Sequence, residues 1–448
     1  NWQVFSHVKP CFMLSPLMVA QYIDPSISFD LVVFDESSQI FVEDALAAIF
    51  RGKQVVIAGD LQQLPPVNFF RAGVQRGQDE EEDNVNFANV SYSLLSEAQK
   101  MLEKSYALRW HYRSYDESLI TFSNRNFYNN SLFTFPNAAK YEADGIFGKY
   151  IQYDVNGCYE SGKGKHINMN EAQCIVQMVK SEIVAYPENS IGIVAFSAAQ
   201  AELIEKLWLD YCATSEDMEL IREWNIKHSD EQLIICNLDS IQGDERDTIF
   251  ISTCYGKDKD GKFNLLTLGP LMNDGGKNRL NVAITRSRHR MVVITSMRHA
   301  QLESLLSSSR GQHIDGARSL SAFLKYVESF SGEGATHAPQ PTPNGLEEKI
   351  CELLDSNGIT YVRKVGDSDC KIDIAVCGSK SGEYLAGIIL EATMNRANSL
   401  REYARLRDEM LQKHGWNLYH IWAIDWFRDF SGESRRLLAY INKIQIYG

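Results

Sequence analysis

The chain has 448 residues, of which 44% are hydrophobic and 23% charged, and its formal net charge is −13. This is the composition of a globular protein with room for two or three domains, and its apolar runs are too short for a membrane-spanning helix, so no membrane partner is expected. The acidic balance argues against a protein covered in phosphate-binding surface, but it does not exclude a locally basic groove for nucleic acid.

The nine cysteines are scattered, and no C-x-x-C pair occurs. This usage indicates a reduced, intracellular compartment such as the cytoplasm and argues against a metal held by cysteines. No signal peptide is visible. Because the chain begins Asn1-Trp2-Gln3 without a methionine, we expect the natural N-terminus to lie upstream.

Strand-like apolar runs recur along the chain with helical segments between them. They cover residues 31–35, 54–60, 190–196, 231–238, 247–255 and 290–296. Runs that are apolar on both faces predict parallel sheets covered by helices on each side, so we expect a doubly wound α/β fold. Such folds bind ligands at the carboxyl ends of their strands, where this chain carries Asp35-Glu36, Gly59-Asp60, Ser197 and Asp239-Ser240.

The first two strand ends have two interpretations each. Asp35 and Glu36 either begin a solvated loop, or they bind Mg²⁺ and activate a water beside a nucleotide phosphate. The stretch VVIAGDLQQLPPV (55–67) either makes an ordinary turn or places a glutamine where it could sense a γ-phosphate. Two strands that end in Asp within about 25 residues favour the phosphate site.

Two stretches interrupt this pattern. The acidic residues 75–84 predict a solvated loop without chemistry. Residues 329–345 are rich in Gly, Pro, Ser and Thr and predict a flexible linker, beyond which about 100 residues form a further region.

The motifs, in chain order, resemble those of superfamily 1 helicases, in the branch of the nonsense-mediated-decay RNA helicase and senataxin. The matching stretches are DESSQ (35–39), GDLQQLPP (59–66), LRWHYRS (108–114), NRNFYNNSL (124–132), IGIVAFSAAQ (191–200), NLDSIQGDERD (237–247) and RLNVAITRSRHRMVVI (279–294). The resemblance implies two RecA-like domains with ATP between them, the first of them incomplete in this chain.

The resemblance also implies roles for single residues. Asp35 would coordinate Mg²⁺, Glu36 would activate water and Gln63 would contact the γ-phosphate. Arg113 and Arg286 would reach the transferred phosphoryl group, where an arginine is worth on the order of a thousandfold in rate. Further residues implied at the nucleotide or in the loop that couples it to nucleic acid are Asp60, Gln200, Gly243 and Glu245.

Helicases of this branch track one strand of nucleic acid, so single-stranded DNA or RNA is the expected partner. Ser197 and Ser240 are candidate phosphate contacts at strand ends. Trp110 and Tyr112 are open between base stacking and the core.

A phosphate-binding loop, G-x-x-x-x-G-K-[ST], should precede the Asp-Glu motif. GCYESGKG (157–164) has the glycines and the lysine, but Gly164 replaces the hydroxyl residue and the stretch lies in the second domain, so we interpret it as a hairpin. The loop is therefore expected upstream of Asn1, and this chain alone should bind ATP poorly and hydrolyse it little.

Residues 346–427 predict helix, strand, a strand ending near Asp373, a strand ending at Glu391, helix and strand. Two carboxylates on adjacent strands are the geometry with which PD-(D/E)xK nucleases hold a metal against a phosphate. The stretches KIDIAV, GIILE, RLRDEML and GWNLYHIWAIDWF resemble the very-short-patch-repair-like endonuclease domain, which implies Asp373 and Glu391 as metal ligands and Glu347 on the first helix. The segment EATMNRA departs from that pattern, and Thr393 stands in the place of the motif lysine.

The predicted organisation is the C-terminal part of a first RecA-like domain (1–106), a second RecA-like domain (107–328), a linker (329–345) and a small restriction-endonuclease-like α/β domain (346–448). The leading hypothesis is the C-terminal part of an ATP- and Mg²⁺-dependent helicase or translocase with an appended nuclease-like domain, in bacterial DNA processing or defence. The alternative is a non-catalytic module that binds nucleic acid or protein through degenerate sites.

Overall fold

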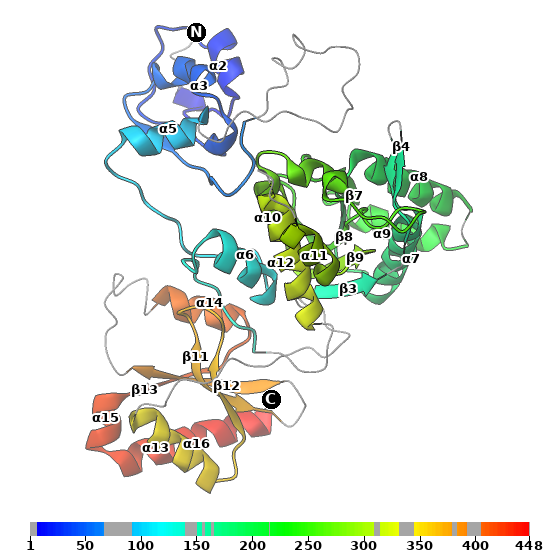
Figure 1. Ribbon diagram of the computed structural model, residues 1–448. Coiled ribbons are helices and arrows are strands. Elements are labelled where there is room, and N and C mark those ends of the chain that lie inside the picture. Colours follow the sequence, from blue (N-terminus) through cyan, green and yellow to red (C-terminus); the bar gives the residue numbers. More distant parts are fainter. Residues whose placement is uncertain are drawn as a thin grey trace. The chain divides into compact units, whose positions relative to one another are not determined.

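The computed structural model describes residues 7–66, 92–138, 150–154, 157–162, 165–214, 216–308, 314–330, 345–378, 383–391 and 405–447 (Figure 1). The chain separates into two compact units. The first holds residues 1–107, 268–282 and 311–317, and the second holds residues 108–267, 283–310 and 318–448. The domain boundaries within these units remain a prediction.

Two of the interruptions predicted from the sequence fall largely outside the described residues. The acidic loop at 75–84 lies wholly outside them. The predicted linker at 329–345 is described only at its ends, where α12 (Asp315–Phe330) ends and α13 (Gly345–Ser356) begins.

The first unit contains two parallel strands, β1 (Val32–Phe34) and β2 (Val55–Ile57), in the register Val32↔Val55. Around them lie α2 (Pro16–Tyr22), the short helix η1 (Ser37–Gln39), α3 (Val42–Ile49), α5 (Leu94–Met101), η3 (Leu265–Met272) and α10 (Gly276–Ile284). Phe34 of β1 is buried in a core with residues of α3 and α5. The parallel pairing predicted for these two runs is confirmed, although both strands are shorter than expected.

A five-stranded sheet forms the centre of the second unit, in the order β3-β9-β8-β6-β7 with every pairing parallel. Its strands are β3 (Tyr150–Asp154), β6 (Ile191–Ala195), β7 (Ile234–Asn237), β8 (Arg246–Ser252) and β9 (Ser287–Thr295). The four apolar runs predicted here are thus confirmed as parallel strands. β3 is an additional strand at the edge.

Helices cover both faces of this sheet because its side chains are apolar on both sides. Phe250, Val292 and Ile294 pack in a core with α7 (Met169–Ala185), α8 (Ala198–Thr214) and α9 (Met218–Lys227). Ile249 and Val293 alternate with them, point to the opposite face and are also buried. Further helices of this part are α6 (Ser118–Phe127), α11 (His299–Ser308) and most of α12.

Residues 157–162 do not form a phosphate-binding loop. β4 (Glu160–Gly162) pairs antiparallel with β5 (Lys165–Ile167), so the stretch is the hairpin that the sequence predicts. Lys163 and Gly164 lie outside the described residues.

The C-terminal part is a four-stranded sheet in the order β10-β11-β12-β13, and Figure 1 shows α13, α15 and α16 together on one side of it and α14 on the other. Its elements are β10 (Tyr361–Val365), β11 (Ile372–Cys377), β12 (Tyr384–Glu391), α14 (Arg407–Lys413), β13 (Leu418–Trp422), α15 (Ala423–Arg428) and α16 (Phe430–Tyr447). The predicted order of elements is confirmed. One detail is wrong: Asp373 is the second residue of β11 and does not lie near its end.

Among the described helices, none is both long and apolar enough to span a membrane.

Candidate functional site

The predicted carboxylates Asp35 and Glu36 lie directly after β1, and both are exposed. Glu36 adopts the left-handed conformation with φ 49°, which is uncommon for a residue with a side chain and marks a constrained position. The Asp35 carboxylate accepts the Glu36 N–H at 2.9 Å, and η1 follows at once. Both carboxylates are therefore presented to solvent at the edge of the sheet.

The β2 end reaches the same edge because the two strands are parallel. Ser37 joins them: its N–H and its hydroxyl both donate to Ala58 O, at 3.0 and 2.6 Å. A Cβ on Gly59 would lie 2.8 Å from Ser37 Oγ and 3.0 Å from Ser37 N, so glycine is required where the two strand ends approach.

The loop after Gly59 is ordered by Asp60. One oxygen of its carboxylate accepts the Gln62 N–H at 2.8 Å, and the other accepts the amide of Gln63 at 3.2 Å. The side chain of Gln63 is thus oriented by Asp60, on the same edge as Asp35 and Glu36 in the first unit.

Two asparagines of α10 hold this loop, and no role was predicted for either of them from the sequence. Asn278 Nδ2 donates to Leu61 O at 2.8 Å and to Gln63 O at 2.7 Å, while Asn281 Nδ2 donates to Gln62 O at 2.9 Å. Their spacing of three residues puts both amides on one face of the helix. The Asn-x-x-Asn spacing within α10 is the signal that could have identified them.

Replacing Asn278 and Asn281 together with alanine is expected to lower the free energy of unfolding by about 2–3 kcal/mol, because part-buried loop carbonyls lose their donors. A urea titration followed by fluorescence measures this loss. Asn357→Ala, which removes an exposed amide that donates to Leu353 O, is the matched control and should cost under about 0.5 kcal/mol. Equal losses in both variants would contradict the role of the α10 asparagines.

In the second unit, Arg113 and Arg286 lie near the same imidazole, that of His111. Burial first, and then the charges of Arg113 and Arg286, lower the pKa of His111 to about 3. The His111 Nε2 accepts the Ser114 N–H at 3.2 Å, which keeps the ring neutral beside the two guanidinium groups. The structure therefore brings together the two arginines that the sequence places far apart.

The two arginines differ in exposure. Arg113 Nε donates to the Glu245 carboxylate at 2.5 Å, and both side chains are about one-third exposed. Arg286 is buried and donates to Thr285 Oγ1 at 2.9 Å.

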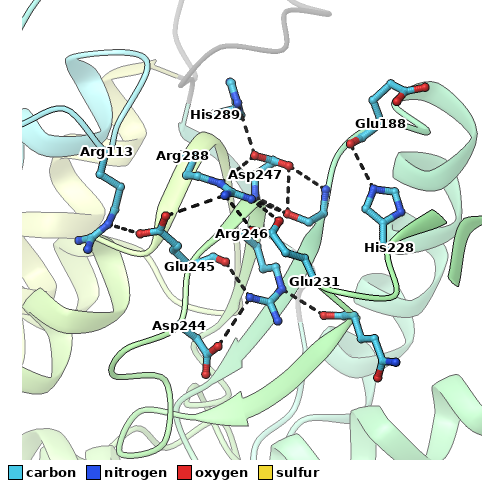
Figure 2. Close-up of polar contacts among 12 residues, drawn as sticks. Arg113, Glu188, His228, Glu231, Asp244, Glu245, Arg246, Asp247, Arg288 and His289 are labelled. Carbon is cyan, nitrogen blue, oxygen red and sulfur yellow. Dashed lines mark hydrogen bonds and ion pairs between the residues drawn. The ribbon is translucent and has the colours of Figure 1, made fainter. Parts of the chain in front are cut away.

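Glu245 belongs to a network of ion pairs around the start of β8 (Figure 2). Arg288 on β9 is at its centre, with Nε 2.9 Å from Asp247 and Nη1 3.0 Å from Glu231 and 3.9 Å from Glu245. Burial lowers the pKa of Arg288, but hydrogen bonding and the charges of these carboxylates outweigh it and raise the pKa. Arg288 thus links the strand after Arg286 to the residue that binds Arg113.

The loop between β7 and β8 contains Gly243, which has φ 93° and no atom within 4 Å of a Cβ added there. Space is available, so the left-handed backbone is what requires glycine. Ser240 in the same loop is exposed, and its hydroxyl donates to the Asn237 side chain at 2.9 Å.

Ser197 and Gln200 lie in the buried interior. The Ser197 hydroxyl donates to His166 O at 2.5 Å, and the Gln200 amide donates to Asn168 O at 3.0 Å and to Ser252 Oγ at 3.1 Å. Their contacts with phosphate and nucleotide remain predictions, and each would require these bonds to be exchanged.

In the C-terminal part, Asp373 at the start of β11 lies beside the end of β12, where its carboxylate accepts the Leu390 N–H at 2.8 Å. Lys364 on β10 supplies the positive charge: its Nζ is 2.5 Å from Asp373 and 3.4 Å from the buried carboxylate of Glu347. Lys364 has φ 52°, a left-handed backbone within a strand. The sequence reasoning missed this lysine.

Glu391, the other predicted metal ligand, is held by Arg407 at 2.9 Å and by His420 at 3.2 Å. Hydrogen bonds with Asp408 and Glu391 raise the pKa of His420 to about 9, so the ring is cationic at neutral pH. Thr393 lies outside the described residues.

A divalent metal does not fit this arrangement. Within the described ranges, no group of three or more His, Cys, Asp or Glu side chains could hold a metal ion. Each predicted ligand is instead neutralised by a cation of the chain, Asp373 by Lys364 and Glu391 by Arg407 and His420.

Comparison with known families gives separate matches for the part that contains the predicted helicase motifs and for the C-terminal part. Residues 90–298 and residues 18–70 each match an AAA domain family, AAA_12 and AAA_11, and residues 346–441 match the REase_MTES_1575 family.

Curated relatives are helicases. The chain is 31% identical over 431 residues to the uncharacterized ATP-dependent helicase MG140 homolog of Mycoplasma pneumoniae, covering 91% of this chain and 36% of that protein. It is 30% identical over 421 residues to the uncharacterized ATP-dependent helicase MG140 of Mycoplasma genitalium, covering 89% and 35%. With the probable helicase senataxin of Homo sapiens it shares 23% identity over 284 residues, covering 61% and 10%.

The chain spans about a third of the length of the two MG140 proteins. The resemblance to the senataxin branch of helicases is confirmed. The chain is therefore a homologue of the MG140 and senataxin helicases, with AAA domains followed by a REase_MTES_1575 endonuclease-like domain.

Proposed function

We propose that this chain forms most of the ATP-hydrolysing core of a nucleic-acid helicase or translocase, in a polypeptide that also contains a phosphate-binding loop. The observation that carries the proposal is the pair of exposed carboxylates at the β1 end, on the same edge as a glutamine that Asp60 orients. Because the relatives are ATP-dependent helicases, we infer that the ligand at this edge of the sheet is a nucleotide phosphate.

In this proposal, Asp35 holds the Mg²⁺ of Mg·ATP, and the ion neutralises charge on the phosphate oxygens. Glu36 takes a proton from the attacking water, and Gln63 binds the γ-phosphate. Arg113 and Arg286 stabilise the charge that develops on the transferred group. Asp60 keeps Gln63 in position through the hydrogen bond at 3.2 Å.

The loop of Gly243 and Glu245 connects this chemistry to nucleic acid. Ser240 is its exposed hydroxyl, and Ser197 and Gln200 are the deeper residues assigned to phosphate and nucleotide. The proposed partner is one strand of DNA or RNA, bound mainly through its phosphates.

The test is ATP hydrolysis by the polypeptide that contains this chain, with and without single-stranded DNA or RNA, followed by separation of a labelled duplex. Hydrolysis that rises several-fold with nucleic acid supports the proposal. Absence of ATP hydrolysis in the presence of both nucleic acids overturns it.

For the endonuclease-like domain we propose that it binds nucleic acid or protein without metal-dependent cutting. The reason is that Lys364 pairs with Asp373 and Arg407 pairs with Glu391. A plasmid incubated with Mg²⁺ or Mn²⁺ tests this directly, with Asp373→Ala as the control. Cutting by the wild type that Asp373→Ala abolishes would restore the nuclease.

Removing Lys364 should leave the two carboxylates that it contacts, those of Asp373 and Glu347, available to a divalent ion. Lys364→Met is expected to raise the affinity for Mn²⁺ at least about tenfold, since an ion pair at contact distance in a part-buried site is worth several kcal/mol before screening. Isothermal titration with MnCl₂ measures the change. Lys349→Met, which removes the same charge from an exposed pair with Glu352, is the control, and unchanged Mn²⁺ affinity in Lys364→Met refutes the idea.

A further inference from the structure

Residues 108–138, here called the arm, carry Arg113 and precede the five-stranded sheet. The arm buries its aromatic side chains in a core that belongs to the endonuclease-like domain. Phe133, Phe135 and Ala138 lie in one cluster with Ile372, Ile389, Leu411 and Trp416. The half-buried Trp110 packs against both phenylalanines, with ring centroids 5.6 and 5.5 Å away, so its ring is engaged with this cluster.

Hydrogen bonds to backbone carbonyls fix the same contact. Trp416 Nε1 donates to Pro136 O at 2.7 Å, and both atoms are buried. Ala138 N–H donates to His414 O at 3.1 Å, and Tyr384 N–H donates to Ala138 O at 2.9 Å. The end of the arm is thus bonded to β12 and to the turn that follows α14.

A second set of polar contacts lies nearer to Arg113. Ser368 Oγ donates to Thr134 O at 2.7 Å, and the Thr134 hydroxyl donates to the buried Glu117 carboxylate. The other oxygen of Glu117 accepts the Asp367 N–H at 3.0 Å. Glu117 is four residues from Arg113, so the endonuclease-like domain reaches the start of the arm as well as its end.

The opposite side of the arm contacts the AAA domain. Tyr115 N–H donates to Arg288 O at 2.7 Å, and its ring stacks on His289 with centroids 4.6 Å apart. The same ring lies 5.4 Å from His414 of the endonuclease-like domain. Tyr115, two residues after Arg113, therefore touches both domains.

We propose that the endonuclease-like domain is a positioning element of the ATPase: by completing the core under the arm, it holds Arg113 in place against Glu245. The inference rests on the proposed function only in that Arg113 acts on ATP. The domain thereby has a role in the motor that does not depend on cutting nucleic acid, and a ligand bound to it would act on ATP hydrolysis through the arm.

Two buried tryptophans of the same domain provide a matched test. Trp416 is 2% exposed and lies in the core shared with the arm, whereas Trp426 is 1% exposed and lies in the other core, which the arm does not enter. Trp416→Leu is expected to raise amide hydrogen exchange in residues 109–117 at least about tenfold, by lowering the free energy of local opening. Trp426→Leu should lower the melting temperature without a specific change in those residues.

The outcomes are distinct. Equal exchange of the arm in both variants, or no change in Trp416→Leu, overturns the inference. If Trp416→Leu does not fold, Trp416→Phe, which removes the hydrogen bond to Pro136 O but keeps an aromatic ring in the core, is measured in the same way.

ATP hydrolysis adds a readout that a general loss of stability does not move. In the hydrolysing polypeptide, Trp416→Leu is expected to lower kcat about tenfold with little change in KM, since small displacements of a catalytic group are costly. Added to Arg113→Ala, it should have no further effect, because both changes remove the same interaction. Independent effects in the double variant contradict the inference, whereas a wild type without ATP hydrolysis contradicts the proposed function and leaves the exchange experiment to decide on the arm.

Discussion

Replacing Glu36 with glutamine is expected to lower kcat for ATP hydrolysis by at least about 100-fold, because general-base catalysis contributes on that order. The experiment requires the polypeptide that supplies a phosphate-binding loop. The amide keeps the size of the side chain but cannot take the proton of the attacking water. ATP binding should be retained, so the dissociation constant of ATP is measured beside kcat.

The structure makes this effect specific to one position. Glu36 is exposed at the β1 end in a left-handed conformation, on the edge that also holds Asp35. Glu43, on the first turn of α3 in the same unit, is the control for loss of one carboxylate, and Glu43→Gln should leave kcat unchanged. Full turnover in Glu36→Gln would remove Glu36 from the chemistry.

Replacing Arg286 with alanine is expected to lower kcat about 1,000-fold, the usual effect of an arginine that stabilises a transferring phosphoryl group. Arg286→Lys should recover little of this loss, because an ammonium lacks the planar fork that binds two phosphate oxygens. Steady-state kinetics with ATP measure both variants, and the melting temperature is recorded to separate catalysis from stability.

The contacts of Arg286 hold its side chain in one orientation. It is buried, it donates to Thr285 Oγ1 at 2.9 Å, and it shares the environment of His111 with Arg113. Arg222, an exposed residue of α9, is the control for loss of one positive charge. If Arg286→Ala lowers the melting temperature but not kcat, the arginine is structural.

Much of the fold could be predicted because burial leaves a direct trace in the sequence. A strand covered on both faces is apolar at nearly every position, and the runs at 190–196 and 290–296 are such strands. β3, with Tyr, Gln and Asp among its residues, has no such pattern and was not predicted. The prediction for Asp373 chose the wrong end of its strand. The pattern of apolar residues shows that a strand is present but does not show at which residue it begins.

The candidate site was predictable to the extent that its residues follow strands or stand in ordered motifs. Asp35, Glu36 and Arg286 are of this kind. The residues that hold the loop of Gln63 are not of this kind: Asn278 and Asn281 bind the carbonyls of that loop from 215 to 219 residues further along the chain. Spacing along the sequence carries no information about such pairs.

By itself, then, the sequence determined the parallel α/β architecture, the order of the helicase motifs and the position of two carboxylates directly after β1, because periodic burial and local motifs depend on neighbouring residues. Tertiary structure alone decided that Lys364 neutralises Asp373 and that the arm of Arg113 is buried against Trp416. Both depend on distances between segments that only the folded chain brings together, where a charge or an apolar surface finds its partner once water is excluded.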